Sequence, residues 1–304
     1  MGWSSADIPD QGGRLALVTG ANSGLGLETA RALAARGATV LLGCRSLQRG
    51  EEARRQLRSD PALGPEASLE LLLLDLADLA SVASAAAAVS QRWGHLDLLI
   101  NNAGVMAPPR ALSRDGFELQ FATNHLGHFA LTRSLLPLLQ GRAGARVVTV
   151  TSGAQHFGRI DFDDLQAERR YDRWRAYGQS KLANTMFALE LQRRLEAEGS
   201  AVLSLAAHPG LARTNLQPTS VAAAGQPLEG LAYRLLDPLF QSAAEGALPQ
   251  LFAATAPGVR GGELFGPDGP AELRGGPSRA RMARAALNSD QRQRLWQVSA
   301  ALCS

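Results

Sequence analysis

The chain has 304 residues, of which 45% are hydrophobic and 19% are charged. This length and composition suit one α/β domain with a large core, and they exclude a disordered chain or a long coiled coil. The 31 basic and 28 acidic side chains leave a net charge of +3, and the arginines are spread along the chain. We therefore expect no nucleic-acid partner.

Metal-binding and membrane-spanning proteins are also disfavoured. Cys44 and Cys303 are too few for a disulfide framework or a four-ligand zinc site. His125 and His128 have the spacing of metal ligands, but no cluster of acidic residues supports them, so we expect no metal. Residues 1–12 lack a secretory pattern, and no apolar run is long enough to span a membrane. We expect a cytoplasmic protein without a membrane span.

Short apolar runs alternate with helical patterns along the chain. Strands are predicted at 14–19, 39–43, 69–74, 96–100, 146–151, 201–206 and 262–265, and helices at 25–36, 46–58, 79–92, 116–139, 177–198, 228–236 and 290–301. This order predicts one α/β domain, a doubly wound parallel sheet of about seven strands with helices on both faces. We place it at residues 12–268, with a substrate loop at 215–241 and a C-terminal extension of the same domain at 269–304.

A glycine-rich turn, Thr19-Gly-Ala-Asn-Ser-Gly-Leu-Gly26, joins the first predicted strand to the first helix. Glycines at these positions let the backbone approach a pyrophosphate, which the N–H groups of a helix N-terminus bind. The turn lacks the Gly-Lys-Ser/Thr of nucleotide triphosphatases. It therefore predicts a dinucleotide cofactor, and the residues expected to bind it here are Gly20, Asn22, Ser23, Gly24, Leu25 and Gly26.

The end of the second strand distinguishes the two nicotinamide cofactors. Its sequence, Leu42-Gly-Cys-Arg-Ser46, contains no acid that would hold the ribose hydroxyls of NAD. Arg45 can instead hydrogen-bond the 2′-phosphate of NADP through its forked guanidinium. We predict NADP(H); the alternative for Arg45 is a solvated residue at the start of a helix.

Further cofactor contacts are predicted where the third and fourth strands end. Asp75 can accept a hydrogen bond from the adenine amino group, cap the next helix, or do both, and Leu76 joins it in the predicted cofactor set. Asn102, Ala103 and Gly104 follow the fourth strand, where small residues let the backbone pass close to a cofactor; the alternative is an ordinary turn.

The sixth strand ends in His208-Pro-Gly210. Pro209, Gly210 and Thr214 are predicted to lie beside the nicotinamide end, and His208 is predicted to be structural rather than catalytic. The substrate pocket is expected to be shaped by the loop at 215–241 and by Met106, Gln155 and His156.

Tyr177 and Lys181 are four residues apart on a predicted helix, so their side chains share one face. A free tyrosine has a pKa of about 10, and a fixed ammonium beside it lowers that pKa because it stabilises the phenolate. Lys181 is the only lysine in the chain. A compact ammonium can also reach the nicotinamide ribose, which a guanidinium does poorly. We predict that Tyr177 and Lys181 form a general acid/base pair; the alternative is that they lie together on the exposed surface of the helix.

Two polar residues complete the predicted site. Ser152 ends the fifth strand, where its hydroxyl can polarise a carbonyl oxygen; taken alone, such a serine is a turn residue. Asn124 lies inside a predicted helix although asparagine disfavours helices. It can kink the helix and hold a water that links Lys181 to solvent; the alternative is an asparagine on the helix surface.

Together these residues resemble the short-chain dehydrogenase/reductase family over about residues 12–266. The matching motifs are Thr-Gly-x-x-x-Gly-x-Gly (19–26), Asn-Asn-Ala-Gly (101–104), Asn124, Ser152, Tyr-x-x-x-Lys (177–181) and Pro-Gly (209–210). The resemblance implies a Rossmann fold and a catalytic tetrad made of Asn124, Ser152, Tyr177 and Lys181.

Finer features look like the retinol dehydrogenase-like branch of this family. They are residues 21–26, Cys44-Arg-Ser46, Asn124-His-Leu-Gly-His-Phe129 and Ser180-Lys-Leu-Ala-Asn184. The branch implies NADP(H) and a hydrophobic alcohol, aldehyde or ketone as substrate, and a homo-oligomer is left open. Two alternatives are a non-catalytic NADPH-sensing or scaffold protein, and an enzyme similar to protochlorophyllide reductase.

Overall fold

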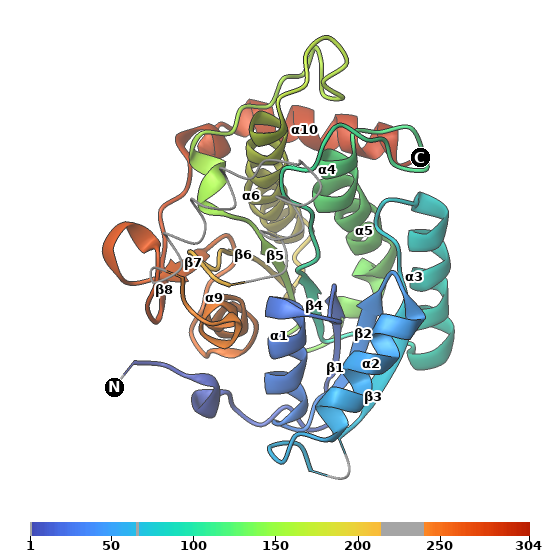
Figure 1. Ribbon diagram of the computed structural model, residues 1–304, viewed down its shortest axis with the longest axis vertical. Coiled ribbons are helices and arrows are strands. Elements are labelled where there is room, and N and C mark those ends of the chain that lie inside the picture. Colours follow the sequence, from blue (N-terminus) through green and yellow to red (C-terminus); the bar gives the residue numbers. More distant parts are fainter. Residues whose placement is uncertain (1, 65–66, 214–239) are drawn as a thin grey trace.

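One central sheet organises the protein in this computed structural model, which describes residues 2–64, 67–213 and 240–304 (Figure 1). Its strand order across these ranges is β3-β2-β1-β4-β5-β6-β7-β8. The strands are β1 (Leu15–Thr19), β2 (Thr39–Cys44), β3 (Leu69–Leu73), β4 (Leu98–Asn101), β5 (Arg146–Val150), β6 (Leu203–Ala207), β7 (Leu264–Pro267) and β8 (Pro277–Arg279).

The predicted doubly wound sheet is confirmed, with one strand more than expected. Strands β1 to β7 pair in parallel, whereas β8 runs antiparallel to β7 at the edge of the sheet. The prediction of seven strands missed β8 because this strand has three residues, begins with a proline and is only half-buried. Such a segment carries no apolar pattern that would reveal a strand.

Helices cover both faces of the sheet, as predicted (Figure 1). The helices on one face are α1 (Gly24–Ala34), α2 (Leu47–Arg58) and α9 (Ala243–Thr255). The helices on the other face are α3 (Leu79–Trp93), α5 (Gly127–Leu139) and α6 (Arg173–Ala197), and α10 (Ser289–Leu302) packs on α6. Helix α9, which contains Pro249 and is capped by Ser242, was not predicted from the sequence.

The two apolar layers explain the unbroken hydrophobic runs of the strands. Successive side chains of a strand point to opposite faces, and both faces are covered here. Ala16 and Val18 therefore pack toward α1 and α9, whereas Leu15 and Leu17 pack toward α3 and α5. All of β1 is buried, which fixes the position of the turn that follows it.

Several predicted boundaries move in the structure. The predicted helix at 116–139 is divided into α4 (Leu119–Phe121), a π-helical turn η2 (Ala122–Leu126) and α5. The helix predicted to start at residue 177 begins at Arg173, where the Asp172 carboxylate caps it. The predicted helix at 228–236 and most of the predicted substrate loop at 215–241 lie outside the described residues.

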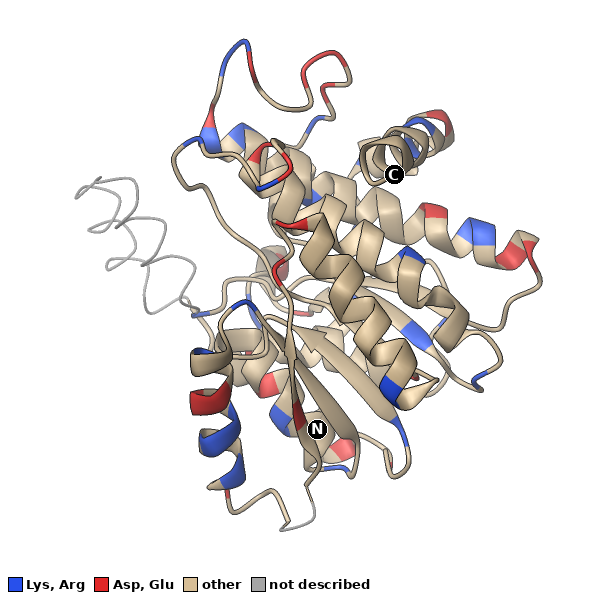
Figure 2. Cartoon of the chain, turned by 90° about the vertical axis from the view of Figure 1, so that its right-hand side faces the viewer, with Lys and Arg blue, Asp and Glu red and all other residues tan. Residues whose placement is uncertain are grey.

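Charged side chains are distributed over several helices and loops rather than gathered on one face (Figure 2). Among the described residues, no helix is both long enough and apolar enough to cross a membrane.

Candidate active site

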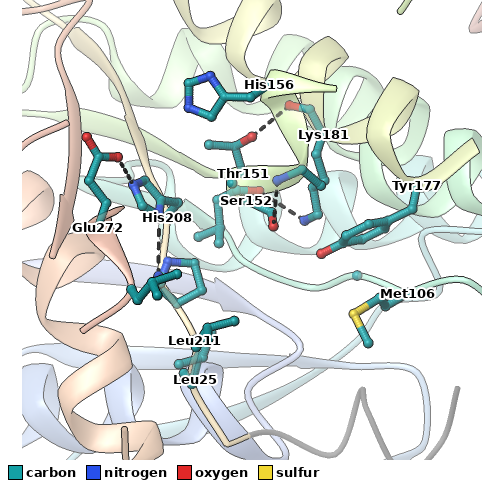
Figure 3. A pocket seen from close by; sticks show the side chains of 18 of the residues that line it. Leu25, Met106, Thr151, Ser152, His156, Tyr177, Lys181, His208, Leu211 and Glu272 are labelled. Carbon is teal, nitrogen blue, oxygen red and sulfur yellow. Dashed lines mark hydrogen bonds and ion pairs between the residues drawn. The ribbon is translucent and has the colours of Figure 1, made fainter. Parts of the chain in front are cut away.

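Two adjoining hollows open where the parallel strands end. The glycine hollow, of about 700 Å³, is lined by the β1–α1 turn, the start of α2 and residues that follow β3 and β4. The central pocket, of about 960 Å³, is lined by residues after β4, β5 and β6, by α6 and by the C-terminal segment (Figure 3). The residues that line both hollows are Leu25, Asn102, Gly104 and Val105.

The glycine-rich turn needs glycine for two separate reasons. Gly20 and Gly24 have φ angles of 67° and 53°, a region that side chains disfavour. A Cβ on Gly26 would lie 2.3 Å from the Gly20 carbonyl oxygen, so α1 could not start so close to the turn. All six residues predicted here to bind a cofactor line the glycine hollow.

The glycine hollow fits a dinucleotide phosphate group. The Ser23 side chain forms no capping hydrogen bond with α1 in the described structure, so the first N–H groups of this helix remain available to an anion. Among the described residues, nothing hydrogen-bonds the buried Thr123 hydroxyl, which also lines the hollow. A polar ligand here would supply the partners that these groups lack.

One wall of the glycine hollow is formed by α2 and by the residue that precedes its N-cap. Arg45 and Arg49 both line this wall. Arg49 was not predicted from the sequence, although its position four residues after Arg45 was the available signal. Glu52 and Gln56 also line this wall, so an acid is present, but it comes from α2 and not from the end of β2.

Asp75 and Leu76 line the glycine hollow, together with Asn102, Ala103 and Gly104. The alternative in which Asp75 caps the next helix is wrong, because Asp78 caps α3. The Asp75 carboxylate instead accepts a hydrogen bond from the N–H of Ala77 at 3.0 Å, in a local turn before that helix.

Tyr177 and Lys181 face the central pocket from α6 (Figure 3). Their exposed fractions are 7% and 5%, so the alternative of a surface pair is wrong. The Lys181 Nζ lies 5.8 Å from the centre of the Tyr177 ring and donates to the Val150 carbonyl oxygen at 3.2 Å. Burial lowers the pKa of Lys181 to about 8, because the charged ammonium loses its hydration.

Ser152 also lines the central pocket, directly after β5 (Figure 3). Its Oγ accepts a hydrogen bond from the N–H of Ala154 at 3.2 Å and caps a short 3-10 helix, η3 (Gly153–His156). Ser152 therefore acts as a turn residue, the role expected of an isolated serine at the end of a strand. Ser152 and Tyr177 line the same pocket.

Asn124 lies in the π-helical turn η2 and is completely buried, so the alternative of a surface asparagine is wrong. Its Oδ1 accepts from the N–H of Val105 at 2.8 Å, and its Nδ2 donates to the Ser180 Oγ at 2.9 Å. A Cβ on Gly104 would lie 3.0 Å from the Asn124 Oδ1 and 3.5 Å from the Lys181 Nζ. Asn124 and Lys181 therefore flank the same glycine.

The C-terminal segment closes one side of the central pocket. His208, predicted to be structural, forms an ion pair or hydrogen bond with Glu272 at 2.9 Å, and its Nδ1 accepts from the N–H of Gly210 at 3.3 Å. This contact holds η5 (Pro270–Glu272) against the turn after β6. Nothing in the local sequence signalled that a segment over 60 residues later would reach the pocket, because it does so through tertiary packing alone.

The other predicted positions divide between the pocket and the core. Pro209, Gly210, Met106 and His156 line the central pocket. Gln155 does not: it is fully buried behind the pocket, where its Oε1 accepts from the Thr185 hydroxyl at 3.0 Å. The prediction for Gln155 was wrong because η3 turns its side chain into the core. Thr214 lies outside the described residues.

Among the described residues, no group of three or more His, Cys, Asp or Glu side chains could hold a metal ion. His125 and His128 instead make separate hydrogen bonds, to Ser299 and Thr19 respectively.

Comparison with known sequences agrees with this geometry. The sequence profile of the short chain dehydrogenase family matches residues 14–224. The chain belongs to this family. Human retinol dehydrogenase 12 is 41% identical over 292 residues, which cover 95% of this chain and 86% of the relative. The resemblance to retinol dehydrogenases is thereby confirmed, and this short-chain dehydrogenase is an oxidoreductase by family.

Solved structures share the fold of this short-chain dehydrogenase. An uncharacterized protein from Mycobacterium paratuberculosis has a TM-score of 0.82 and 43% identity, over 100% of this chain and 98% of that one. A Pseudomonas aeruginosa structure described as a RhlG/NADP active-site complex has a TM-score of 0.64 and 24% identity, over 84% and 94% of the two chains. The second likeness concerns the fold alone.

Proposed function

We propose that this short-chain dehydrogenase uses NADP(H) to interconvert a hydrophobic alcohol and its aldehyde or ketone, with Tyr177 as the general acid/base. One observation carries the proposal. Tyr177 and the buried Lys181 face a pocket that adjoins the glycine hollow, so a proton donor lies next to a site suited to a dinucleotide. This arrangement fits a dehydrogenase better than a protein that only senses or binds the cofactor.

The residues that would hold the successive parts of the cofactor line the two hollows. Residues of the β1–α1 turn would bind the pyrophosphate, Arg45 and Arg49 the 2′-phosphate, and Asp75 with Leu76 the adenine side. Asn102, Ala103 and Gly104 would border the ribose, and Pro209 and Gly210 the nicotinamide. A bound nicotinamide would supply or accept the hydride.

The chain's own residues would handle the oxygen and the proton. In the reducing direction, Ser152 and Tyr177 donate hydrogen bonds to the carbonyl oxygen. Tyr177 then transfers its proton to that oxygen and becomes a phenolate, which the Lys181 ammonium stabilises. Asn124 keeps the backbone at Gly104 and Val105 in place beside Lys181.

The lining of the central pocket supports an apolar substrate. Most of the side chains that line the central pocket are hydrocarbon or aromatic, and burial of an apolar ligand against them is favourable. The larger ones include Leu25, Met106, Phe157, Trp174, Leu211 and Leu273.

Purified protein should test the proposed reaction directly. We expect NADPH oxidation with aldehydes or ketones, and a kcat/KM that rises with the apolar size of the substrate. A panel of linear, aromatic and polyene aldehydes, followed at 340 nm, measures this. NADPH binding without turnover of any member, or a rate equal to that of Tyr177→Phe, would contradict the proposal and favour a sensing role.

The cofactor preference makes a separate prediction. Arg45→Ala should raise the KM for NADPH about 10- to 100-fold and leave the KM for NADH within about twofold of the wild-type value, because only NADPH carries the 2′-phosphate. Arg49→Ala should act in the same direction. Arg58→Ala is the matched control, because it removes an equal charge from the last residue of α2, outside the glycine hollow. Tighter binding of NADH that Arg45→Ala leaves unchanged would rule out this role.

A further inference from the structure

A buried histidine connects the glycine hollow to the helix that carries Asn124. His128 lies in the first turn of α5 and is 1% exposed. Its Nδ1 lies 3.0 Å from the main-chain oxygen of Asn124, and its Nε2 lies 2.9 Å from the Oγ1 of Thr19, the last residue of β1. His128 therefore links Thr19, which lines the glycine hollow, to the main chain of Asn124, and it lines neither hollow itself.

The hydrogen-bond partners determine which ring nitrogen carries the proton. A carbonyl oxygen only accepts hydrogen bonds, so Nδ1 must be protonated to bond Asn124. A neutral ring then has an unprotonated Nε2, which accepts the hydroxyl proton of Thr19. The neutral form agrees with the pKa of His128, which is lowered to about 4, mainly by burial and also by the nearby Lys181 ammonium, whereas the hydrogen bond to Asn124 raises it.

This assignment uses the bonding capacity of the Thr19 hydroxyl completely. Its oxygen accepts from the N–H groups of Asn102 and of Ala103, both at 2.9 Å. Its proton goes to His128, because the only other acceptor among the described residues is the Ile100 carbonyl oxygen, at the longer distance of 3.3 Å. A hydroxyl offers one donor and two acceptor positions, and all three are filled.

From this network we infer that His128 is a positioning residue for dinucleotide binding: through Thr19 it fixes the Asn102–Ala103 turn that lines the glycine hollow, and through the Asn124 main chain it ties that turn to the π-helical turn η2. The inference rests on the proposed function, because it assumes that a dinucleotide occupies this hollow. It gives a role to a histidine that the proposed reaction does not use.

Two substitutions separate the two bonds of His128. A glutamine places its amide oxygen at about the depth of Nε2, so His128→Gln keeps an acceptor for Thr19. An asparagine reaches only the depth of Nδ1, so His128→Asn keeps the donor to Asn124 and loses the acceptor. We expect His128→Asn to weaken NADPH binding roughly fivefold and His128→Gln to remain within about twofold of the wild type.

In the experiment, the full chain is titrated with NADPH, and the fluorescence of NADPH reports binding. The temperature is kept well below the melting temperature of each variant. Thr19→Val and Thr19→Ser give an independent measurement of the same network. Thr19→Val should bind NADPH more weakly than the wild type, whereas Thr19→Ser should bind it equally well. Adding His128→Asn to Thr19→Val should cause little further loss of NADPH affinity, because the hydrogen bond between Thr19 and His128 is already gone.

The outcomes distinguish this inference from the proposed function. If wild-type protein binds NADPH and both His128 variants bind it equally well, the inference is overturned and the proposed function is not. Equal losses of melting temperature with unchanged affinity would assign His128 to packing alone. A wild-type chain that binds no NADPH overturns the proposed function and this inference with it.

Discussion

Tyr177→Phe is expected to lower kcat by about 10³-fold and to leave the dissociation constant for NADPH within about twofold of the wild type. The substitution removes the proton that the substrate oxygen receives, but it keeps the aromatic ring that lines the central pocket. Steady-state kinetics with the best aldehyde of the panel and a parallel NADPH titration measure the two effects separately. A loss of turnover without a loss of binding is the signature of a group that acts in the transition state.

Tyr171→Phe is the matched control, because Tyr171 is the other tyrosine among the described residues. Its hydroxyl donates to the Pro108 carbonyl oxygen at 2.9 Å and accepts from the Gln120 Nε2 at 3.0 Å. Burial is the main reason that the pKa of this phenol rises to about 12, and the nearby Glu118 carboxylate adds to the effect. We expect Tyr171→Phe to cost about 1 kcal/mol of stability and to change kcat less than threefold.

Equal kcat values for Tyr177→Phe and the wild type would contradict the role of Tyr177 as acid/base. A similar loss in both tyrosine variants would also contradict it, because a general effect of losing a buried hydroxyl would then explain the data.

The sequence was sufficient to predict those features that local chemistry determines. The parallel sheet follows from unbroken apolar runs such as 15–18, which are typical of a strand covered on both faces. The glycine hollow follows from the turn after β1, because Gly20, Gly24 and Gly26 have conformations or contacts that other residues disfavour. The shared face of Tyr177 and Lys181 follows from helical spacing.

Features that depend on distant contacts were missed or mistaken. The wall formed by η5 depends on the contact between His208 and Glu272, which are 64 residues apart. The burial of Gln155 depends on the course of η3 after Ser152, which a turn residue does not specify. Asp75 and Asp78 are both suitable helix caps by sequence, and only the position of α3 determines that Asp78 is the cap.

The buried Lys181 leads to the second large expected effect, an increase in stability when the ammonium is removed. Its pKa falls from 10.5 to about 8 because burial disfavours the charge. By linkage, the charged form costs about 3 kcal/mol of unfolding free energy at neutral pH. Lys181→Met replaces it with an apolar side chain of similar length, and the Val150 carbonyl oxygen keeps its hydrogen bond from the Asn184 Nδ2 at 3.1 Å.

We therefore expect Lys181→Met to raise the unfolding free energy of the cofactor-free protein by about 2 kcal/mol, after allowing about 1 kcal/mol for the lost hydrogen bond. The same variant should lose activity about 100-fold or more, because the Tyr177 phenolate loses its counter-charge. Urea unfolding and steady-state kinetics measure the two effects. A gain in stability with a loss of function is expected where a charge is buried for catalysis.

The pH dependence of stability provides a second check on the cost of burying the Lys181 ammonium, because the pKa shift determines the direction of the change. Between pH 8 and 10.5 the folded wild type binds fewer protons at residue 181 than the unfolded chain, so its stability rises with pH relative to Lys181→Met. The excess unfolding free energy of Lys181→Met over the wild type should therefore be largest below pH 8 and should decrease above it.

Lys181→Arg is the matched charge-retaining control. Its guanidinium remains charged throughout this pH range, and the close approach of Gly104 to the Lys181 Nζ leaves little space for the larger group. This variant should be less stable than the wild type, and its unfolding free energy relative to Lys181→Met should stay constant as the pH passes 8, because neither side chain titrates there. If Lys181→Met instead proved less stable than the wild type at every pH, the cost assigned to burying the ammonium would be wrong. The structural case for an ammonium kept in the pocket for its chemistry would then fail.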